Sequence, residues 1–377
     1  MPAGSSSEVP CVTALGMASA LGDVQTACAA ARAGLRRSKE LDYFPVFSLA
    51  DGSVTGAVGH PVSHLTGGFE GRVRRLRLAH AGLADLLRHV PNPGRLSSAR
   101  SAFYVSLANS ARTTDGAEPD DGARQREAQR LLGNAARIAG WPGEPKVAFV
   151  TTSGHTGAAE ALAAAVTDLR SGRVGTAIVG GIDTLVEEDT LSWLHRTERL
   201  KTPNRAVGLE PGEAAAFVVV ESEATAAPAG TVLACIADVK LGNEPRTLRS
   251  AGTSVGEGLA NAVIAAAPSA RPEEEPPPWL LSDHNGESYR AHEWGNAIVR
   301  LRARSAAFEA LRLWYPAINF GDTGAASGVI AMCVAARAFE RGYAPARRVT
   351  LTSTGDGPER AAVVMHAASL LREARAT

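Results

Sequence analysis

The sequence predicts an α/β protein made of two similar halves packed as one compact unit. Strand-sized apolar runs alternate along the chain with longer runs rich in Ala, Leu and Arg, which is the pattern of strands separated by helices. The same order of runs recurs after residue 225. We therefore expect a short disordered tail at residues 1–10, one half at 11–225 and a second half at 226–377.

Each element of the first half has a local signal. The run 147–151 is β-branched and aromatic, and the run 158–169 carries Ala and Leu on recurring helical faces. The run 176–179 is apolar throughout and ends at a Gly-Gly pair, as expected of a buried strand. Further strands are expected at 11–15 and 215–221, and a helix is expected at 23–33. The strand at 215–221 is expected to form an antiparallel pair with a strand at 231–239, at the start of the second half.

The second half repeats the alternation. Helices are expected at 256–267, 290–303 and 328–341, and strands at 279–281, 348–353 and 361–366. Two segments break the rhythm: 113–127 is acidic and contains Gly, and 268–278 is rich in Pro and Glu. Both are typical of solvated surface loops.

Charge and apolar patterning disfavour nucleic acid and membrane partners. Lys+Arg and Asp+Glu are equal at 39 each, and no basic cluster stands out. The apolar runs are too short to span a bilayer, and the first residues lack the pattern of a signal peptide. The four cysteines (Cys11, Cys28, Cys235 and Cys333) are far apart without C-x-x-C spacing, which predicts reduced, buried thiols in a cytoplasmic protein.

Four segments have the form of active-site loops. They are T-S-G-H-T-G at 152–157, S-D-H-N-G at 282–286, I-N-F-G-D-T-G-A-A-S-G at 318–328 and S-T-G-D-G at 353–357. With them, the opening strand and glycine turn at 11–22, the segment 169–183 and the P-G-E entry at 208–222 resemble the β-ketoacyl synthases of the thiolase superfamily over nearly the full length of the chain. The resemblance implies a five-layered α-β-α-β-α sandwich from two duplicated halves.

The resemblance also implies that most of the chemical positions have changed. The nucleophilic cysteine of the family corresponds to His155, its lysine to Ala317 and its second histidine to Asp322. Its first histidine corresponds to His284, which is kept. The aromatic gate of the acyl pocket corresponds to Asp356 between two glycines.

Three interpretations of these residues remain open. In the first, the chain is an altered acyltransferase or hydrolase that acts on an acyl ester or thioester. Its general base is formed by His155 and Asp322 with His284, and Ser153, Thr156 and Asp356 lie near the substrate. In the interpretation that we favour, the pocket is vestigial and the chain is a non-condensing scaffold or partner subunit. In the third, two His and one or two Asp bind a divalent metal.

The resemblance also suggests partners. It implies a homodimer that pairs through the strand at 146–151, and it makes an acyl thioester or an acyl carrier protein a possible partner. A looser similarity to bacterial ketosynthase-like proteins encoded near secretion-system genes suggests a secretion-associated partner. We expect no cofactor, no bound metal, no nucleic acid and no membrane.

Overall fold

The computed structural model describes residues 9–108, 112, 120–226, 232–248, 250, 252–266 and 278–370. Of the expected tail, residues 1–8 lie outside this part, and so does almost all of the Pro-rich run 268–278. Among the described residues, no helix is both long enough and apolar enough to cross a bilayer.

Ten strands form one continuous order that consists of two groups of five. In the first half the spatial order is β1-β7-β6-β4-β5, and in the second it is β8-β12-β11-β9-β10. When the five strands of each half are numbered in the order of the sequence, both spatial orders are first, fifth, fourth, second, third. The parallel and antiparallel pairings also agree. The two halves are therefore copies of one topology, and the strand order passes from one to the other through two residue pairs between β1 and β8.

The strands of the two groups have the following bounds. In the first half they are β1 (Pro10–Ser19), β4 (Ser101–Leu107), β5 (Val147–Thr151), β6 (Thr176–Thr184) and β7 (Glu213–Ser222). In the second half they are β8 (Ala234–Asn243), β9 (Trp279–Ser282), β10 (Arg312–Trp314), β11 (Arg348–Thr354) and β12 (Glu359–Ala367). A separate hairpin consists of β2 (Lys39–Phe47) and β3 (Val54–Gly59).

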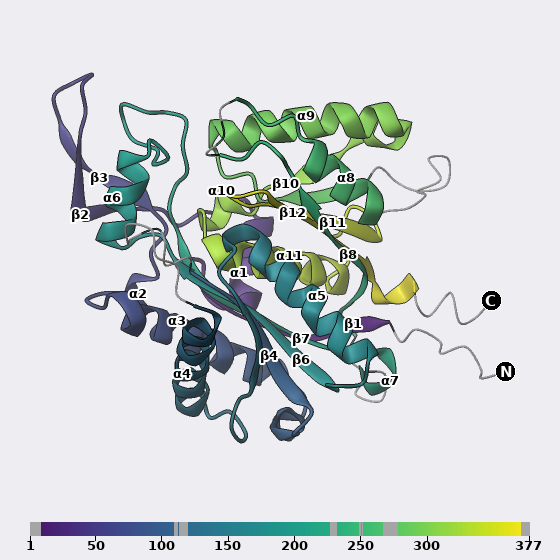
Figure 1. Cartoon of the computed structure of the whole chain (residues 1–377). Helices are drawn as coiled ribbons and strands as arrows, with labels where there is room; N and C mark the ends of the chain where they lie inside the picture. The colour runs from purple at the N-terminus through teal and green to yellow at the C-terminus, as the bar shows by residue number, and fades with distance from the viewer. Residues whose placement is uncertain are drawn as a thin grey trace.

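Helices fill three layers around these strands (Figure 1). Between the two groups of strands lie α5 (Gly157–Arg170) and α11 (Ser327–Glu340), with α1 (Val24–Arg32) beside them. The outer face of the first half is covered by α3 (Gly71–His89) and α4 (Asp121–Ala139), and that of the second by α8 (Glu257–Ala266) and α9 (Ser288–Arg304). The predicted five-layered arrangement is confirmed.

The remaining described helices are short. They are α2 (Ser63–Thr66), α6 (Glu188–Arg196), α7 (Glu223–Ala226) and α10 (Ala317–Phe320), with 3-10 turns at Pro93–Ser97, Gly154–Thr156, Ala306–Ala310 and Gly324–Ala326. Two of these turns, Gly154–Thr156 and Gly324–Ala326, lie directly before α5 and α11. They occupy equivalent places in the two halves and bring the candidate site residues together.

Two expectations about elements are wrong. The segments 215–221 and 231–239 do form strands, but β7 and β8 do not pair with each other, because β1 lies between them. The run 113–127 is not a loop throughout, because α4 begins at Asp121. Asp120 caps this helix by accepting a hydrogen bond from the backbone N–H of Ala123 at 2.7 Å. Residues 113–119 lie outside the described part.

Candidate functional site

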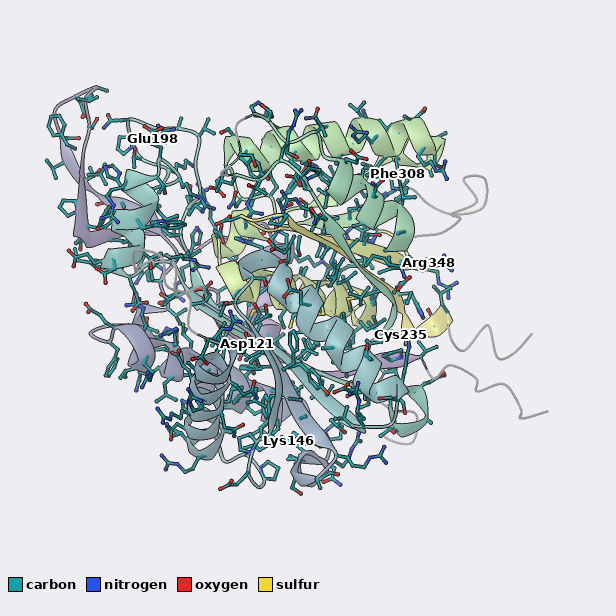
Figure 2. The ribbon with its side chains drawn as sticks, viewed as in Figure 1. Asp121, Lys146, Glu198, Cys235, Phe308 and Arg348 are labelled. Atoms are coloured by element: carbon teal, nitrogen blue, oxygen red, sulfur yellow. The ribbon has the colours of Figure 1, made fainter. Side chains whose placement is uncertain are left out.

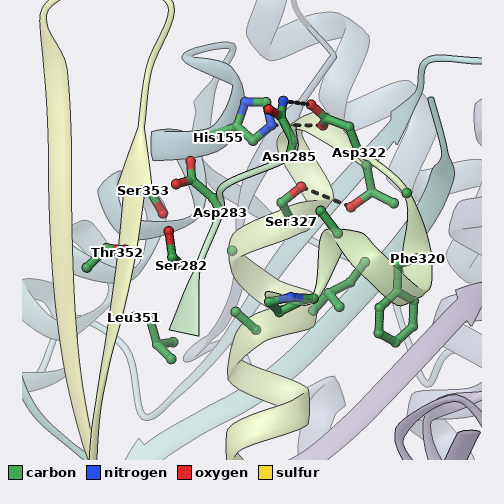
Figure 3. A pocket seen from close by; sticks show the side chains of 17 residues that line it. His155, Ser282, Asp283, Asn285, Phe320, Asp322, Ser327, Leu351, Thr352 and Ser353 are labelled. Carbon is green, nitrogen blue, oxygen red and sulfur yellow. Dashed lines mark hydrogen bonds and ion pairs between the residues drawn. The ribbon is translucent and has the colours of Figure 1, made fainter. Parts of the chain in front are cut away.

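His155 lies on the turn between β5 and α5. Gly154 precedes it with φ +60°, a backbone conformation that side-chain-bearing residues rarely adopt, and this residue turns the chain sharply from strand to helix. His155 is 7% exposed, and its side chain lines a small cavity (Figure 3).

Both ring nitrogens of His155 are hydrogen-bonded to buried, oppositely charged groups. Nε2 lies 2.8 Å from Oδ1 of Asp322, and Nδ1 lies 3.0 Å from Nη2 of Arg290. A guanidinium group can only donate, so Nδ1 must accept this hydrogen bond. The ring proton is then on Nε2, which donates to Asp322, and the imidazole is neutral.

Asp322 is fixed through both its backbone and its side chain. Its backbone N–H donates to the carbonyl of Glu210 at 2.7 Å, and its carbonyl accepts from the N–H of Gly212 at 2.7 Å. Any Cβ at residue 212 would lie 2.5 Å from the carbonyl oxygen of Phe320, so this close approach requires glycine. The carboxylate also accepts from the N–H of Gly324 at 2.8 Å.

Asn285 completes the hydrogen bonds of the Asp322 carboxylate. Its Nδ2 donates to Oδ2 of Asp322 at 2.5 Å and to Oε2 of Glu287 at 2.8 Å (Figure 3 shows the bond to Asp322). Burial would raise the pKa of Asp322, but the contact with His155 and the charge of Arg290 hold it well below the usual range. Asp322 is therefore an ionised, fully bonded carboxylate.

Arg290 is the centre of the charged network. It is 3% exposed, and its Nη1 donates to Asp283 and to the carbonyl of Thr354, each at 2.7 Å. Its Nε donates to Glu287 at 3.2 Å. All three guanidinium nitrogens of Arg290 therefore donate to groups of the protein, and the acceptor for Nη2 is His155.

A second arginine connects this network to the β11–β12 turn. Arg199 donates to Glu287 at 2.5 and 3.1 Å and to Asp356 at 2.7 and 3.0 Å. Burial would raise the pKa values of both acids, but the charge of Arg199 keeps them below the ordinary range. Asp356 is not among the residues lining the cavity, and its carboxylate is held as the partner of Arg199.

His284 does not face the cavity that it was expected to share with His155. Its neighbours Asp283 and Asn285 line the cavity, whereas the His284 ring packs edge-on against Tyr315, with centroids 5.7 Å apart. Burial also lowers the pKa of His284.

The hydroxyl groups beside His155 are also turned away. Ser153 donates to Glu160 at 2.9 Å, and Thr156 donates to the same carboxylate at 3.2 Å. Neither residue lines the cavity. The structure therefore brings together His155 and Asp322 from the predicted set, but not His284, Ser153, Thr156 or Asp356.

The cavity is narrow and mostly apolar. Room for the centre of a water-sized molecule amounts to about 20 Å³, and one bound water needs about 10–15 Å³ of such room. Ala317, Phe320, Ile330 and Leu351 line its apolar end. The space suits one or two water molecules.

Sequence reasoning missed the charged residues of the network. Asp283 and Asn285 lie inside a motif from which only His284 was selected. Glu287 and Arg290 lie at the start of α9, three residues apart and both buried. Arg199 lay outside all four motifs. Among the described residues, no three His, Cys, Asp or Glu side chains are grouped to hold a metal ion, so the metal interpretation gains no support.

Comparison with known proteins identifies the relatives of this arrangement. Residues 92–226 match the family model for the β-ketoacyl synthase N-terminal domain. Over this segment the chain is similar to β-ketoacyl synthases. No curated protein sequence matches it.

Solved ketosynthase structures share the fold across nearly all of this chain. A type II polyketide synthase acyl-carrier protein in complex with its ketosynthase bound to the hexaketide, AntDE:AntF, has a matching chain with a TM-score of 0.73 at 15% identity. The match covers 96% of this chain and 99% of that one. The ishigamide ketosynthase/chain length factor matches with a TM-score of 0.71 at 17% identity, over 96% and 99% of the chains. The oxazolomycin ketosynthase domain OzmH KS7 of Streptomyces albus JA3453 matches with 0.73 at 14% identity, over 96% and 74%.

Proposed function

We propose that this ketosynthase-like chain is a non-condensing scaffold or partner subunit. The observation that carries the proposal is the engagement of both ring nitrogens of His155. A general base needs a nitrogen lone pair directed at the substrate. In His155 the lone pair of Nδ1 is directed at Arg290, and Nε2 carries the proton donated to Asp322.

The 2.8 Å bond between His155 and Asp322 favours the alternative of an altered acyltransferase or hydrolase acting on an acyl ester or thioester. A carboxylate bonded to one imidazole nitrogen assists a base only when the other nitrogen reaches the substrate. Here Arg290 occupies that second position, and the cavity beside the pair has room for one or two waters. The vestigial interpretation accounts for both facts.

The edge strand β5 supports a role in assembly. It is the last strand of its group; Ala148 is exposed, and Phe149 and Val150 are half-buried. An unpaired edge is a ready template for another strand. We propose a second copy of the chain as the first partner, with a different thiolase-fold chain or an acyl carrier protein as further partners.

One end of this edge is already satisfied within the chain. The N–H of Val147 donates to Gln129 at 3.1 Å, and its carbonyl accepts from Gln125 at 2.6 Å. Both glutamines belong to α4. Pairing with a second chain is therefore expected along residues 148–151, beyond the point covered by the glutamines.

The catalytic part of the proposal is tested by acyl loading. The protein is incubated with acyl and malonyl thioesters, free or on an acyl carrier protein, and intact mass and products are recorded. We expect no covalent adduct and no β-keto product. His155→Cys alone is expected to load little acyl group, because Ala317 and Asp322 remain. Acylation of a native cysteine, or robust turnover that disappears in His155→Ala, would show an active enzyme.

The tautomer of the His155 ring can be measured independently of acyl loading. Nitrogen-15 NMR of labelled histidine, with His155→Ala to assign the signals, is expected to show a neutral ring protonated at Nε2. A neutral ring protonated at Nδ1 would leave Nε2 as an acceptor and would contradict the bonding that carries the proposal.

A further inference from the structure

Two cysteines meet where the two halves of the strand order join. Cys11 is on β1 and Cys235 is on β8, and the two residues lie directly opposite each other in the antiparallel register. Their Sγ atoms are 3.1 Å apart, and both residues are fully buried. Figure 2 labels Cys235 on the side of the molecule where β1 begins.

The register suits a disulfide bond. Opposite residues of an antiparallel pair have Cα atoms about 4.5–5.5 Å apart, inside the range of about 4.4–6.8 Å that disulfides span. The sulfur atoms need to approach by about 1 Å to reach a bond length near 2.05 Å. Rotation about χ1 supplies a movement of this size without displacing either strand.

We propose that Cys11 and Cys235 are an oxidisable pair, which hydrogen peroxide converts into a disulfide across the junction of the two halves. One thiol, as its thiolate, attacks a peroxide oxygen and becomes a sulfenic acid, releasing water once the leaving hydroxide is protonated. The second thiol attacks the sulfenic sulfur and a second water leaves. In total, two thiols lose two protons and two electrons, and one peroxide takes them up to become two waters.

Proximity rather than acidity selects this pair. The hydrogen bond with Cys11, and then burial, raise the pKa of the Cys235 thiol. Burial also raises the pKa of Cys28 to about 12 and that of Cys333. All these thiols are therefore weakly ionised and slow to react. Only at the Cys11–Cys235 contact does a sulfenic acid form with a second thiol already at 3.1 Å.

The bond would reinforce the weakest part of the strand order. Only two residue pairs connect β1 to β8, and the two cysteines are 224 positions apart in sequence. A cross-link that closes such a long loop restricts the unfolded chain strongly. The oxidised protein is expected to melt about 5 °C higher than the reduced one. This inference is independent of whether the His155 site is catalytic.

The test compares the native protein with matched serine variants. Wild type and Cys28→Ser/Cys333→Ser are exposed to hydrogen peroxide, and the remaining thiols are alkylated under denaturing conditions before peptide mapping. We expect a linked peptide pair containing Cys11 and Cys235 in both proteins, and a rise in Tm that dithiothreitol reverses. Cys11→Ser and Cys235→Ser should show neither change.

Two results would overturn the inference. One is recovery of Cys11 and Cys235 as separate thiols or separate higher oxides, under conditions that oxidise other residues of the same protein. The other is a linked peptide pair containing Cys28 or Cys333 in their place. Both readings come from wild type, so they hold even when a serine variant fails to fold.

Discussion

Asn285 joins two carboxylates of the buried network, since one amide group donates to both Asp322 and Glu287. Replacing an amide donor by a third carboxylate removes both bonds and adds like-charge repulsion in a buried position. Asn285→Asp is expected to lower the free energy of unfolding by about 3 kcal/mol at pH 7. Urea denaturation measures this loss.

Lowering the pH should reduce the difference in unfolding free energy between Asn285→Asp and wild type. The new carboxyl group faces two others, so its folded pKa is raised, and protonation as the pH falls restores a donor. Asn296→Asp is the matched control: Asn296 is exposed on α9, the helix that follows Asn285 in sequence, and it donates to the carbonyl of Ser254 at 2.7 Å. A control variant as unstable as Asn285→Asp would show that the network is not the cause.

His155→Ala separates a structural role from a catalytic one. The change leaves the buried Asp322 carboxylate without one donor and frees the Nη2 of Arg290, so we expect a loss of about 1–3 kcal/mol in stability. Chemical denaturation of both proteins measures it. His155→Gln, which keeps a donor, is expected to lose less. Equal stability of His155→Ala and wild type would contradict the bonding described for the ring.

At the scale of single residues, the sequence motifs predict the positions of His155 and Asp322 but not the charged residues around them. His155 and Asp322 each occupy a recognisable turn, so their meeting follows from the resemblance. Arg290 lies outside the motifs, and its side chain meets His155 across 135 positions of sequence. The reach and direction of a long side chain depend on packing that a linear pattern does not contain.

Among the elements, β5 makes the assembly proposal testable. Ala148 is exposed on its edge, and a carboxylate there would face its copy in a two-fold strand pair. Ala148→Glu is expected to shift the protein to monomer at micromolar concentration, measured by light scattering or sedimentation. Val299→Glu, on the 66% exposed residue of the outer helix α9, should leave the association unchanged. A wild-type monomer, or a dimer unaffected by Ala148→Glu, would contradict the proposal.

Element types were easier to predict than element partners. The helical run after His155 and the strand before it follow from periodicity and β-branching, and β5 has the predicted bounds. The acidic start of α4 was interpreted as a loop, although negative charge favours the first turn of a helix. The wrong prediction that β7 pairs with β8 rests on the assumption that consecutive strands are neighbours in the sheet. Here β1, some 200 positions earlier, lies between them.

For the whole molecule, the repeated order of apolar runs in the sequence predicts the repeated strand order. The sequence does not predict that β1 and β8 are neighbours, because the two residue pairs that join them leave no pattern in either strand. The five-layered arrangement itself came from the resemblance. The alternation of runs alone indicates only an α/β protein.

The buried carboxylates predict how stability depends on pH. Asp322, Glu287 and Asp356 have folded pKa values below their ordinary range, so the unfolded chain binds more protons in acid. Their contribution is complete above the unfolded values near pH 4 and is lost as the pH falls below them. The urea midpoint should therefore fall steeply below about pH 4.5. A less steep acid loss is expected for Arg199→Met/Asp356→Leu, which removes an ion pair; an identical loss would point to other groups.

The way in which Asp322 is attached has a consequence for redesign. Its loop is tied down by main-chain bonds to Glu210 and Gly212, which are available to any amino acid except proline at position 322. The framework can therefore keep its shape while the side chain is exchanged. Different chemistry can be installed at this position without rebuilding the loop, and the same independence allows a reactive group to disappear while the architecture persists.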